Sequence, residues 1–533
     1  MMGDEFNTIV LAALLHDVGK LLQRGRSLLF DIKGRHPEVS ARFVAAFQRA
    51  FSDYAEPSLL QTLVLHHHRT IRGTRPDDIS DPRQRTLAFL INKADGLSAS
   101  ERGQRARGGR DYKTTPLAPV FERVALTAKR RDEPRTRYHP KPLTSPRSMD
   151  YGLFPGSFTR YAPGELEELL LEFGRASYPV LQRADFASFD SLVLYLLNLL
   201  QTYAWPVPSD TQSLVPDVSL FDHLRSTAAI AGCLYLFYDA KGTLNEGSLK
   251  DTDKEAFLLA AGDLSGIQSY IFDIATGDEV GGGVARRLRA RSLFVQLLST
   301  VVSHHVLRRL RLPPTHLLMA SGGKFYLLLP NLSETVDMLE ETRREADTWC
   351  LEVLRGEVAV NLAWVPFNEA QLRSTAKGGE GFGAVMQKAT AALAILKEQK
   401  LCFGLVSGNR WNEEEFILSG FDGGDVCPSC GKFPRLLDEE LCKQCGLDQR
   451  WGARLPRAKY IAITPASSSG ELDILGYGVS LCECAGDVPA DASLVLAINN
   501  PGAPSVKGAP TSSYHLVTQV PTEERERESV ALT

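Results

Sequence analysis

The sequence lacks any apolar run of the roughly 18–20 uncharged residues that a membrane-spanning helix needs. Its opening stretch, MMGDEFNTIV, lacks the basic segment that begins a secretory signal peptide. Neither sign of charge dominates, since the formal net charge is −4 over 533 residues. This balance argues against a uniformly basic nucleic-acid coat but permits a local basic groove. We therefore expect a cytoplasmic protein with no membrane contact.

Cysteine is scarce, with nine residues, and four of them fall in one short segment. Cys427-Pro-Ser-Cys430 and Cys442-Lys-Gln-Cys445 are two C-x-x-C knuckles, each followed by glycine. In a reducing compartment this spacing favours a tetrahedral Zn²⁺ site over disulfides. Four thiolates leave no open coordination position, so the zinc is predicted to be structural. Unpaired buried thiols are the alternative.

Hydrophobic periodicity and composition divide the first half of the chain into three parts. Residues 1–105 carry apolar residues at helical spacing and predict an all-helical domain. Residues 106–150 are rich in Arg, Lys, Pro and Gly, which is typical of a basic linker. Helical patterning returns in residues 151–250, the predicted connecting region.

The second half begins with a different order of elements. Residues 251–370 predict a strand, a long helix, two strands joined by Ser-Gly-Gly-Lys, a second helix and a further strand. This β-α-β-β-α-β order is the ferredoxin-like unit, whose helices are expected to cover one sheet face and leave the other free. Residues 371–455 predict a helical zinc-finger domain, and residues 456–533 a β-rich stretch with a charged tail. The predicted fold class is multidomain α+β.

A His-Asp pair, His16-Asp17, ends the first apolar run, LAALLHDVGK. Alone, the pair is as compatible with helix capping and core packing as with metal binding. Further candidate ligands are His36, Asp95 and the consecutive His66, His67 and His68. Histidines and aspartates from several helices are typical of HD-type metallohydrolases, in which divalent metals activate water and neutralise a phosphodiester. Neutral imidazoles with a carboxylate suit Mn, Ni, Co or Fe.

The three consecutive histidines cannot all face one centre, because successive helical residues point about 100° apart. We predict that His66 and His67 are ligands and that His68 lies outside the first coordination sphere or is exposed. A second His-Asp combination, Asp222-His223, has no matching cluster nearby in the sequence. Capping and packing are therefore predicted for that pair.

Asp263, Ser265 and Gly266 fall where the first strand of the ferredoxin-like unit gives way to a turn, whose backbone amides could cradle a phosphate. Gly322 and Gly323 occupy the predicted hairpin turn, where positive φ angles and missing side chains would let a nucleotide approach the backbone. Helix capping and a plain tight turn explain the same residues equally well.

Several stretches together resemble a known family, the large (Cas-ten) subunit of type III CRISPR effector complexes. In chain order they are LLHDVGK, KADGLSASER, PDVSLFDHLRSTAAIAGCLY, GDLSGIQSYIF, RARSLF, SGGKFYLLLP and CPSCG…CKQCG…GARLPRAKY. The Gly-Asp-x-Ser-Gly-Ile-Gln wording is similar to the Csm, or type III-A, branch. The resemblance runs from residue 11 to about residue 485.

The resemblance implies an N-terminal HD domain that cleaves single-stranded DNA and a zinc-bearing helical domain. It also implies that residues 251–370 are a first palm and that residues 456–533 are the start of a second palm region with the charged tail. Paired palms of the family convert ATP, with Mg²⁺, to cyclic oligoadenylate when target RNA binds. Guide RNA, target RNA and sibling Csm subunits are the implied partners in antiviral defence. Matched by motif, the HD metal site comprises His16, Asp17, His66, His67 and Asp95, with His36 a weaker match, and the nucleotide contacts comprise Ser265, Gly322 and Gly323.

One departure from the family pattern concerns the cyclase. The Gly-Gly-Asp-Asp hairpin of the second palm is absent, and the first-palm hairpin reads Gly-Gly-Lys-Phe, without a carboxylate for Mg²⁺. The DGGDVC stretch at residues 422–427 abuts a zinc knuckle and is rejected. We expect this chain to cleave DNA, to supply at most half of an ATP site and to make no cyclic oligoadenylate by itself. The alternatives are a non-catalytic scaffold of the same ribonucleoprotein, or an HD phosphohydrolase that acts on nucleotides.

Overall fold

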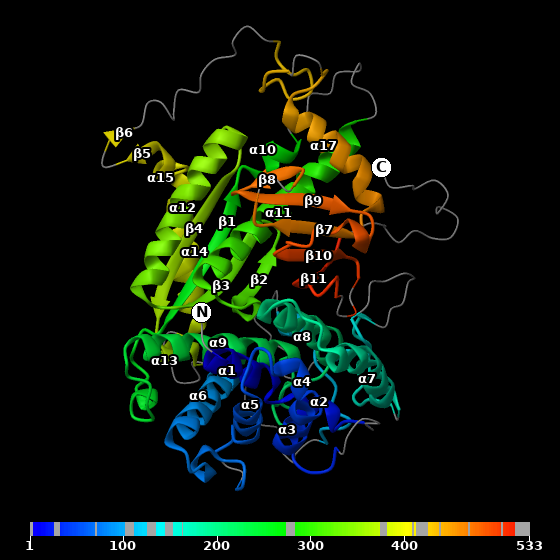
Figure 1. Ribbon diagram of the computed structural model, residues 1–533, viewed down its shortest axis with the longest axis vertical. Helices are drawn as coiled ribbons and strands as arrows, with labels where there is room; N and C mark the ends of the chain where they lie inside the picture. Colours follow the sequence, from blue (N-terminus) through cyan, green and yellow to red (C-terminus); the bar gives the residue numbers. More distant parts are fainter. Residues whose placement is uncertain are drawn as a thin grey trace.

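The computed structural model describes residues 4–25, 32–69, 72–101, 111–124, 135–143, 153–162, 164–272, 283–373, 381–407, 410–411, 425–435, 439–466, 470–500, 502 and 505–516. The rejected Gly-Gly stretch at residues 422–424, much of the expected basic linker and the charged tail lie outside these residues. Helices and two larger sheets build the rest, which confirms the mixed α+β class (Figure 1).

The N-terminal part is all-helical. Its elements are α1 (Asp4–Leu15), α2 (Val18–Leu22), α3 (His36–Ala46), α4 (Gln48–Phe51), α5 (Pro57–Leu65) and α6 (Pro82–Ser98). The apolar run expected as one helical stretch is broken at His16-Asp17, which form a turn between α1 and α2. Asp17 holds the N-cap position of α2, yet its side chain makes no capping hydrogen bond. The carboxylate is therefore left for contacts with other elements.

Three longer helices follow: α7 (Glu165–Arg183), α8 (Phe189–Ala204) and α9 (Leu220–Ala240). Helix α9 packs against α1 and α6 on one side and against strand β3 (Lys324–Pro330) on the other. Figure 1 shows α9 lying across the N-terminal helices, beneath the first sheet. One continuous buried apolar cluster joins these helices to that sheet. The helical and palm parts consequently share a core.

The first sheet has the ferredoxin-like order β2-β3-β1-β4, with every neighbouring pair antiparallel. Its elements are β1 (Phe257–Ser265), α11 (Val284–Leu310), β2 (Leu317–Ser321), β3, α12 (Ser333–Leu354) and β4 (Ala359–Phe367), with the short α10 (Ile267–Phe272) after β1. Ser321 pairs with Lys324 across a two-residue turn in which Gly322 and Gly323 have φ of 60° and 86°. The β-α-β-β-α-β prediction and its hairpin are confirmed.

The expectation of a free sheet face is wrong. On one face, the Arg343 guanidinium of α12 lies 4.1 Å from the centre of the Trp364 ring of β4. On the other face, the Phe367 ring lies 5.8 Å from the Phe382 ring of α14 (Phe382–Glu398). Helix α14 packs along β4 and β1, and α9 along β3. The sheet is apolar on both sides, as strand β1 is almost wholly buried, so both sides need cover.

The remaining elements carry the cysteine knuckles and the second sheet. They are α13 (Glu369–Leu372), α15 (Cys402–Leu405), β5 (Val406–Ser407), β6 (Arg410–Trp411), α17 (Lys443–Arg454), β7 (Tyr460–Thr464), β8 (Leu472–Ile474), β9 (Tyr477–Cys482), β10 (Leu494–Ile498) and β11 (Thr511–Tyr514). The second sheet has the order β11-β10-β7-β9-β8. It docks on α11 and α12 through polar contacts such as Tyr514 Oη with Gln296 Oε1, at 2.9 Å, and Trp349 Nε1 with Asp473 Oδ1, at 3.0 Å.

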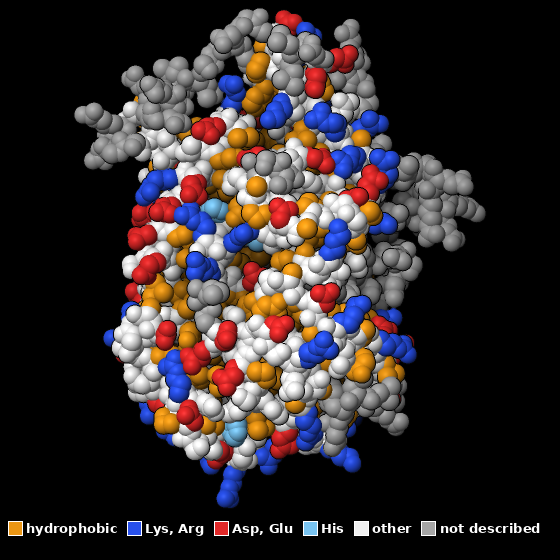
Figure 2. Space-filling view, in the orientation of Figure 1, with side chains coloured by type: hydrophobic (Ala, Val, Ile, Leu, Met, Phe, Trp, Pro, Cys, Tyr) orange, Lys and Arg blue, Asp and Glu red, His pale blue; other side chains and the backbone are white. Residues whose placement is uncertain are grey.

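Acidic and basic side chains are interspersed on the face of the molecule seen in Figure 2, in line with the small net charge. Within the described residues, none of the helices has both the length and the apolar character to cross a bilayer.

Candidate metal centre

Histidine and aspartate side chains from five places in the chain converge between α1, α3, α5, α6 and α9. They form two groups whose potential ligand atoms lie within 4.8 Å of one another. The first group comprises His16, Asp17, Asp95 and His223, and the second comprises Asp17, His36, His67 and His68. Asp17 belongs to both groups, so its carboxylate lies at the middle of the cluster.

The first group surrounds one oxygen of Asp17. His16 Nε2 lies 3.3 Å from Asp17 Oδ2 and 3.7 Å from Asp95 Oδ1. His223 Nε2 lies 3.6 Å from the same Asp17 oxygen and 3.1 Å from Asp95 Oδ1. All four residues are buried, because they lie at the junction of α1, α6 and α9.

The second group surrounds the other oxygen of Asp17. His36 Nε2 and His67 Nε2 lie 3.3 Å and 3.6 Å from Asp17 Oδ1. His68 Nε2 lies 2.6 Å from His36 Nε2. The two oxygens of one carboxylate thus face two separate sets of imidazole nitrogens.

Backbone and hydroxyl groups fix the orientation of three of the imidazoles. His16 Nδ1 lies 2.8 Å from the Ala13 carbonyl, and His67 Nδ1 lies 2.7 Å from the Val64 carbonyl. A carbonyl oxygen can only accept, so each Nδ1 carries the proton and donates it. His223 Nδ1 lies 2.9 Å from Ser98 Oγ. Such bonds leave the Nε2 atoms facing the Asp17 carboxylate, the arrangement that metal-ligating histidines adopt.

The buried polar atoms at the centre fit a metal site. His16 Nε2, His67 Nε2 and Asp17 Oδ1 make no hydrogen bond to any residue that the structure describes, while Asp17 Oδ2 pairs with Lys20 Nζ at 2.5 Å. Buried polar atoms in proteins are almost always satisfied, and leaving three together unsatisfied would be costly. Divalent cations held by these atoms would satisfy all of them. Imidazole nitrogens with carboxylate oxygens are the donor set of first-row transition metals.

Burial and the neighbouring charged groups shift the pKa values of the residues around Asp17. Burial disfavours the ionised Asp17 carboxylate, but Lys20 and His16 hold its pKa well below its usual range. Burial also disfavours the His16 imidazolium, but Asp17 and Asp95 outweigh it and raise the pKa of His16 to about 9. Burial lowers the pKa of His36 to about 2. A neutral His36 offers its lone pair to a cation.

The structure brings together His16, Asp17, His36, His67 and Asp95, as the sequence predicted. It differs at the histidine triplet, where His68 joins the cluster and His66 does not. Helix α5 ends at Leu65, so the 100° rule for helical residues does not apply to the three histidines. The His66 ring turns away, and its Nδ1 lies 3.0 Å from the Arg75 carbonyl.

His223 is the ligand candidate that the sequence reasoning missed. Capping and packing were predicted for Asp222-His223, because no matching residues lie near it in the sequence. Helix α9 carries His223 into the cluster across more than 120 residues of chain. The position of His223 in the resembling stretch PDVSLFDHLRSTAAIAGCLY was the available signal. The structure also differs from the expected division at residue 105, since α9 of the connecting region completes this site.

The first-palm candidates lie together at the end of β1. Asn361 Nδ2 donates to Ser265 Oγ at 2.8 Å, and the Leu264 amide donates to the Gly323 carbonyl at 3.0 Å. The Gly322-Gly323 turn is therefore held beside Ser265 and Gly266. The Asp263 carboxylate is buried between Lys397 Nζ at 2.6 Å and Lys324 Nζ at 3.6 Å. Its charge is neutralised within the protein.

The four knuckle cysteines also converge, and their sulfur atoms lie within 4.8 Å of one another. The Gly431 and Gly446 amides donate to the Cys427 and Cys442 carbonyls, closing each knuckle as a tight turn. Cys430 Sγ and Cys442 Sγ are 3.8 Å apart, which is about the edge of a tetrahedron with Zn–S bonds near 2.3 Å. The cluster could hold one zinc ion.

Two protein-family models match this chain, one over the N-terminal helices and one over the ferredoxin-like unit. The HD domain family model matches residues 1–100, and the model of Csm1 subunit domain B matches residues 256–403. The cysteine knuckles and the second sheet lie beyond these two matches.

Curated relatives include the "CRISPR system single-strand-specific deoxyribonuclease Cas10/Csm1 (subtype III-A)" of Mycobacterium tuberculosis, 28% identical over 481 residues. The protein of the same description from Streptococcus thermophilus is 26% identical over 464 residues. Each alignment covers 83% of this chain, which spans 56% and 55% of the two relatives. The chain thus spans little more than half the length of these relatives.

Solved structures show the same fold. The Csm1-Csm4 cassette in complex with AMPPNP matches 96% of this chain and 60% of the solved chain, with a TM-score of 0.66 and 20% identity. The cassette in complex with cA3 matches equally well, at 21% identity. The shared fold covers nearly all of this chain.

Proposed function

We propose that this chain is a metal-dependent single-strand deoxyribonuclease, because it is a homologue of the Cas10/Csm1 subunits of type III-A CRISPR systems. The observation that carries this proposal is the pair of ligand groups sharing Asp17. A nuclease site of this kind needs buried, unsatisfied donor atoms facing one point from rigid elements, and α1, α3, α6 and α9 supply them.

The residues divide into two metal sets with one bridging group. His16, Asp95 and His223 would hold one divalent cation through Asp17 Oδ2, and His36, His67 and His68 a second through Asp17 Oδ1. Mn²⁺, Ni²⁺ or Co²⁺ suits this donor set. Bound cations of this type supply an activated water and neutralise the phosphodiester. The chain's own contribution is to orient the imidazoles of His16, His67 and His223 through their Nδ1 contacts.

The test is cleavage of single-stranded DNA by the purified chain with Mn²⁺. The double variant His16→Ala plus Asp17→Ala is expected to lose at least a hundredfold in rate, since it removes ligands of both cations. His66→Ala is the matched control, because His66 points away from the cluster and should retain activity. Undiminished cleavage by the double variant would contradict the nuclease proposal and favour the scaffold role.

The first palm supports a second proposal, that this chain contributes half of an ATP site with Mg²⁺. Its support is the glycine turn held beside Ser265, next to Lys324, whose side chain is half exposed and lies 3.6 Å from Asp263. The solved Csm1-Csm4 cassettes in complex with AMPPNP and with ATP have the same fold. Without a Gly-Gly-Asp-Asp hairpin in the sequence, the chain alone is expected to bind ATP weakly and to form no cyclic oligoadenylate. Chromatography of the products after incubation with ATP and Mg²⁺ checks this.

The remaining roles follow from the same homology. We propose that the four knuckle cysteines hold a structural zinc ion, and that the chain works with guide RNA, target RNA and sibling Csm subunits in an RNA-guided antiviral complex. Copurification of this chain with a crRNA and a Csm4-like subunit, from cells that express the whole set, tests the assembly. Metal analysis of the purified chain, with and without Cys430→Ser, tests the zinc ion.

A further inference from the structure

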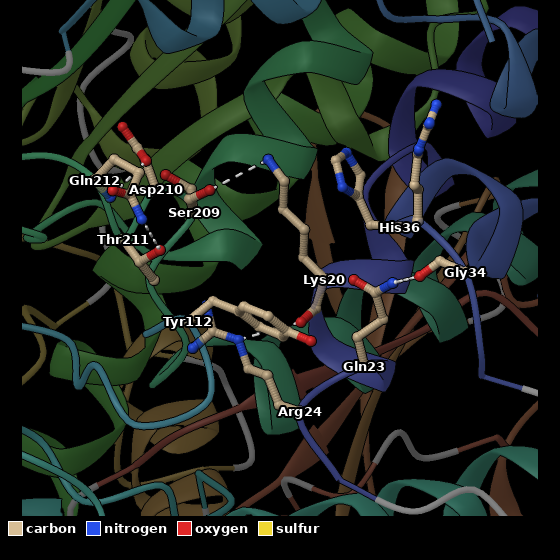
Figure 3. Close-up of a pocket in the computed structure, with 11 residues that line it drawn as sticks. Lys20, Gln23, Arg24, Gly34, His36, Tyr112, Ser209, Asp210, Thr211 and Gln212 are labelled. Carbon is tan, nitrogen blue, oxygen red and sulfur yellow. Dashed lines mark hydrogen bonds between the residues drawn. The ribbon is translucent and has the colours of Figure 1, made fainter. Parts of the chain in front are cut away.

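A cavity of about 420 Å³ adjoins the proposed nuclease centre. Helix α2, the segment before α3, the residues around Tyr112 and the segment 209–212 form its walls. His36 belongs to both the cavity wall and the metal-ligand cluster, and Lys20, which also lines the cavity, pairs with Asp17 of the cluster at 2.5 Å (Figure 3). The cavity therefore lies directly beside the cluster. The volume lies within the usual range for small-ligand sites and is large enough for one nucleotide.

The charge of this cavity is mainly positive. Lys20, Arg24 and Arg35 line it, against the single carboxylate of Asp210. The Asp210 oxygens accept from the Gln212 amide at 2.8 Å and from Ser213 Oγ at 2.9 Å. That carboxylate therefore accepts hydrogen bonds within its own turn. Lys20 pairs with Asp17 Oδ2 at 2.5 Å, so Arg24 and Arg35 are the cations that an anion in the cavity would meet.

Arg24 is unusual among these cations because it is only 6% exposed. Its Nε donates to the Lys20 carbonyl at 3.1 Å and its Nη2 to the Pro208 carbonyl at 3.2 Å. Its Nη1 has no hydrogen-bond partner within the described part of the chain. Burial lowers the pKa of Arg24 to about 10, although the Asp111 carboxylate favours its charged form, and the group stays charged at neutral pH. A buried guanidinium with an unsatisfied N–H is costly, and an anion in the adjoining cavity relieves that cost.

The other walls suit a nucleotide rather than a bare anion. Ser209 Oγ is buried and has no hydrogen-bond partner among the described residues. Tyr112 is 43% exposed and lies alongside Arg24 in Figure 3, so its ring offers a surface at the cavity edge. An aromatic ring beside a cluster of cations is the usual arrangement for single-stranded nucleic acid, in which bases stack and phosphates pair.

We propose that this cavity is a nucleotide subsite that positions the single DNA strand beside the metal centre. One backbone phosphate binds at Arg35 beside the buried charge of Arg24, and the neighbouring base stacks on Tyr112. The inference rests on the proposed nuclease function and adds the residues that hold the strand. A strand is favoured over a free nucleotide because His36 lies in both the cavity wall and the ligand cluster, so DNA held in the cavity would continue to the site of cleavage. Arg24 is a positioning residue.

The first test is the affinity for a fluorescent decathymidylate in Ca²⁺ buffer, without transition metals, so that the strand stays intact. Arg24→Gln and Tyr112→Ala are each expected to weaken binding by about tenfold, the scale of one lost stacking or phosphate contact. Arg24→Gln should also flatten the dependence of log K on log salt by about 0.7, as one lost phosphate contact on a single strand does. Arg49→Gln, an exposed arginine on α4, is the matched control and should change neither quantity.

Unchanged affinity and salt dependence in both folded variants would overturn the subsite. Tyr112→Ala keeps the test decisive if Arg24→Gln fails to fold, because the exposed Tyr112 ring is not part of the core. Displacement of the labelled strand by thymidine monophosphate as readily as by a trithymidylate would assign the cavity to a free nucleotide and overturn the strand assignment.

Cleavage kinetics separate this inference from the proposed function. With Mn²⁺, Arg24→Gln should raise KM for DNA far more than it lowers kcat, whereas loss of a metal ligand lowers kcat. A wild-type chain that cleaves no DNA would reject the nuclease proposal, while the binding measurements would still decide the subsite.

Discussion

At the scale of single residues, the metal centre depends on where each imidazole edge points. Asp17 occupies a capping position but makes no cap, and both of its oxygens face histidines. His66, His67 and His68 are adjacent in the chain, yet only the last two enter a cluster. A one-residue shift of this segment would replace a ligand histidine with one that points away from the metal centre.

The role of His223 gives the first prediction. His223→Ala should remove about one bound Mn²⁺ equivalent and lower the DNA cleavage rate at least tenfold, because it leaves Asp17 Oδ2 and Asp95 with one imidazole. Isothermal titration with Mn²⁺ and a nuclease assay measure the two effects. Asp222→Ala is the control, since the Asp222 carboxylate contacts Arg225 and lies outside both groups. Equal metal binding by wild type and His223→Ala would remove His223 from the site.

A pH-dependent prediction concerns Asp347 of α12, which lies far from the metal centre in the chain. Burial raises the pKa of Asp347 to about 6, although its Oδ2 accepts from the Phe403 amide at 3.0 Å. Between the unfolded pKa near 3.8 and about 6, the unfolded chain loses this proton and the folded chain keeps it. The group therefore lowers stability as pH rises through that window, by at most about 3 kcal/mol.

Asp347→Asn keeps the acceptor oxygen and removes the charge. We expect the variant to have a higher apparent Tm than the wild type at pH 7.5 and the same apparent Tm near pH 4, as measured by scanning calorimetry. A gain that is constant across this pH range would show that the carboxylate does not titrate as described.

At the scale of elements, the short helix α2 determines how close α3 comes to Asp17. A Cβ on Gly19 would lie 2.2 Å from the His36 carbonyl oxygen and 2.8 Å from Ser40 Oγ. The Gly19 amide donates to that same hydroxyl at 2.8 Å. The glycine in the HDVGK stretch thus allows the two helices to approach until His36 reaches Asp17.

The third prediction follows from this contact. Gly19→Ala should push α3 away, cost about 1–3 kcal/mol of stability and weaken metal binding at the His36 side of the cluster. Thermal unfolding and Mn²⁺ titration measure the two losses. Gly96→Ala is a matched control, because Gly96 is next to Asp95 on α6 and a Cβ there meets nothing within 4 Å. If Gly19→Ala binds Mn²⁺ as the wild type does, the spacing argument fails.

At the scale of the whole molecule, α9 connects the proposed nuclease centre with the palm. It carries His223 at one end and packs along β3 of the first sheet. Lys93 of α6 forms a further buried link, with Nζ 2.5 Å from Glu369 Oε1 of α13. The metal centre and the nucleotide-binding candidates of the palm are therefore parts of one packed body.

The cysteine cluster supports a fourth prediction at this scale. Arg291 of α11 pairs with Asp448 of α17 at 3.0 Å and donates to Cys445 Sγ at 3.8 Å, so the knuckles anchor α17 on the palm. Removing the metal with a strong chelator should release about one zinc per chain and lower the apparent Tm by several degrees, because folding and metal binding are coupled. Atomic absorption and calorimetry measure both effects. Chelation that leaves the Tm unchanged would mean that the thiols pack without metal.

Local sequence patterns were sufficient to predict many of the helices, strands and turns of this protein. Strand and helix periodicity predicted the ferredoxin-like unit and its glycine turn, and the spacing of the cysteines predicted their cluster. The separate strands and helices, the glycine turn and the cysteine knuckles depend on contacts close in sequence, where propensity and turn geometry dominate. The pairing of β1 with β3 and β4 joins segments that are distant in the chain. The sequence also grouped most of the cluster as candidate metal ligands, namely His16, Asp17, His36, His67 and Asp95.

The tertiary structure decided the rest. Packing between distant segments decides three features. These are the covering of both faces of the first sheet, the presence of His68 rather than His66 in the cluster, and the entry of His223. The sequence by itself determined which residues could bind a metal and which elements would carry them. Only the fold determined which imidazole edges meet the two Asp17 oxygens, because that depends on where α5 ends and on how α9 packs across α1 and α6.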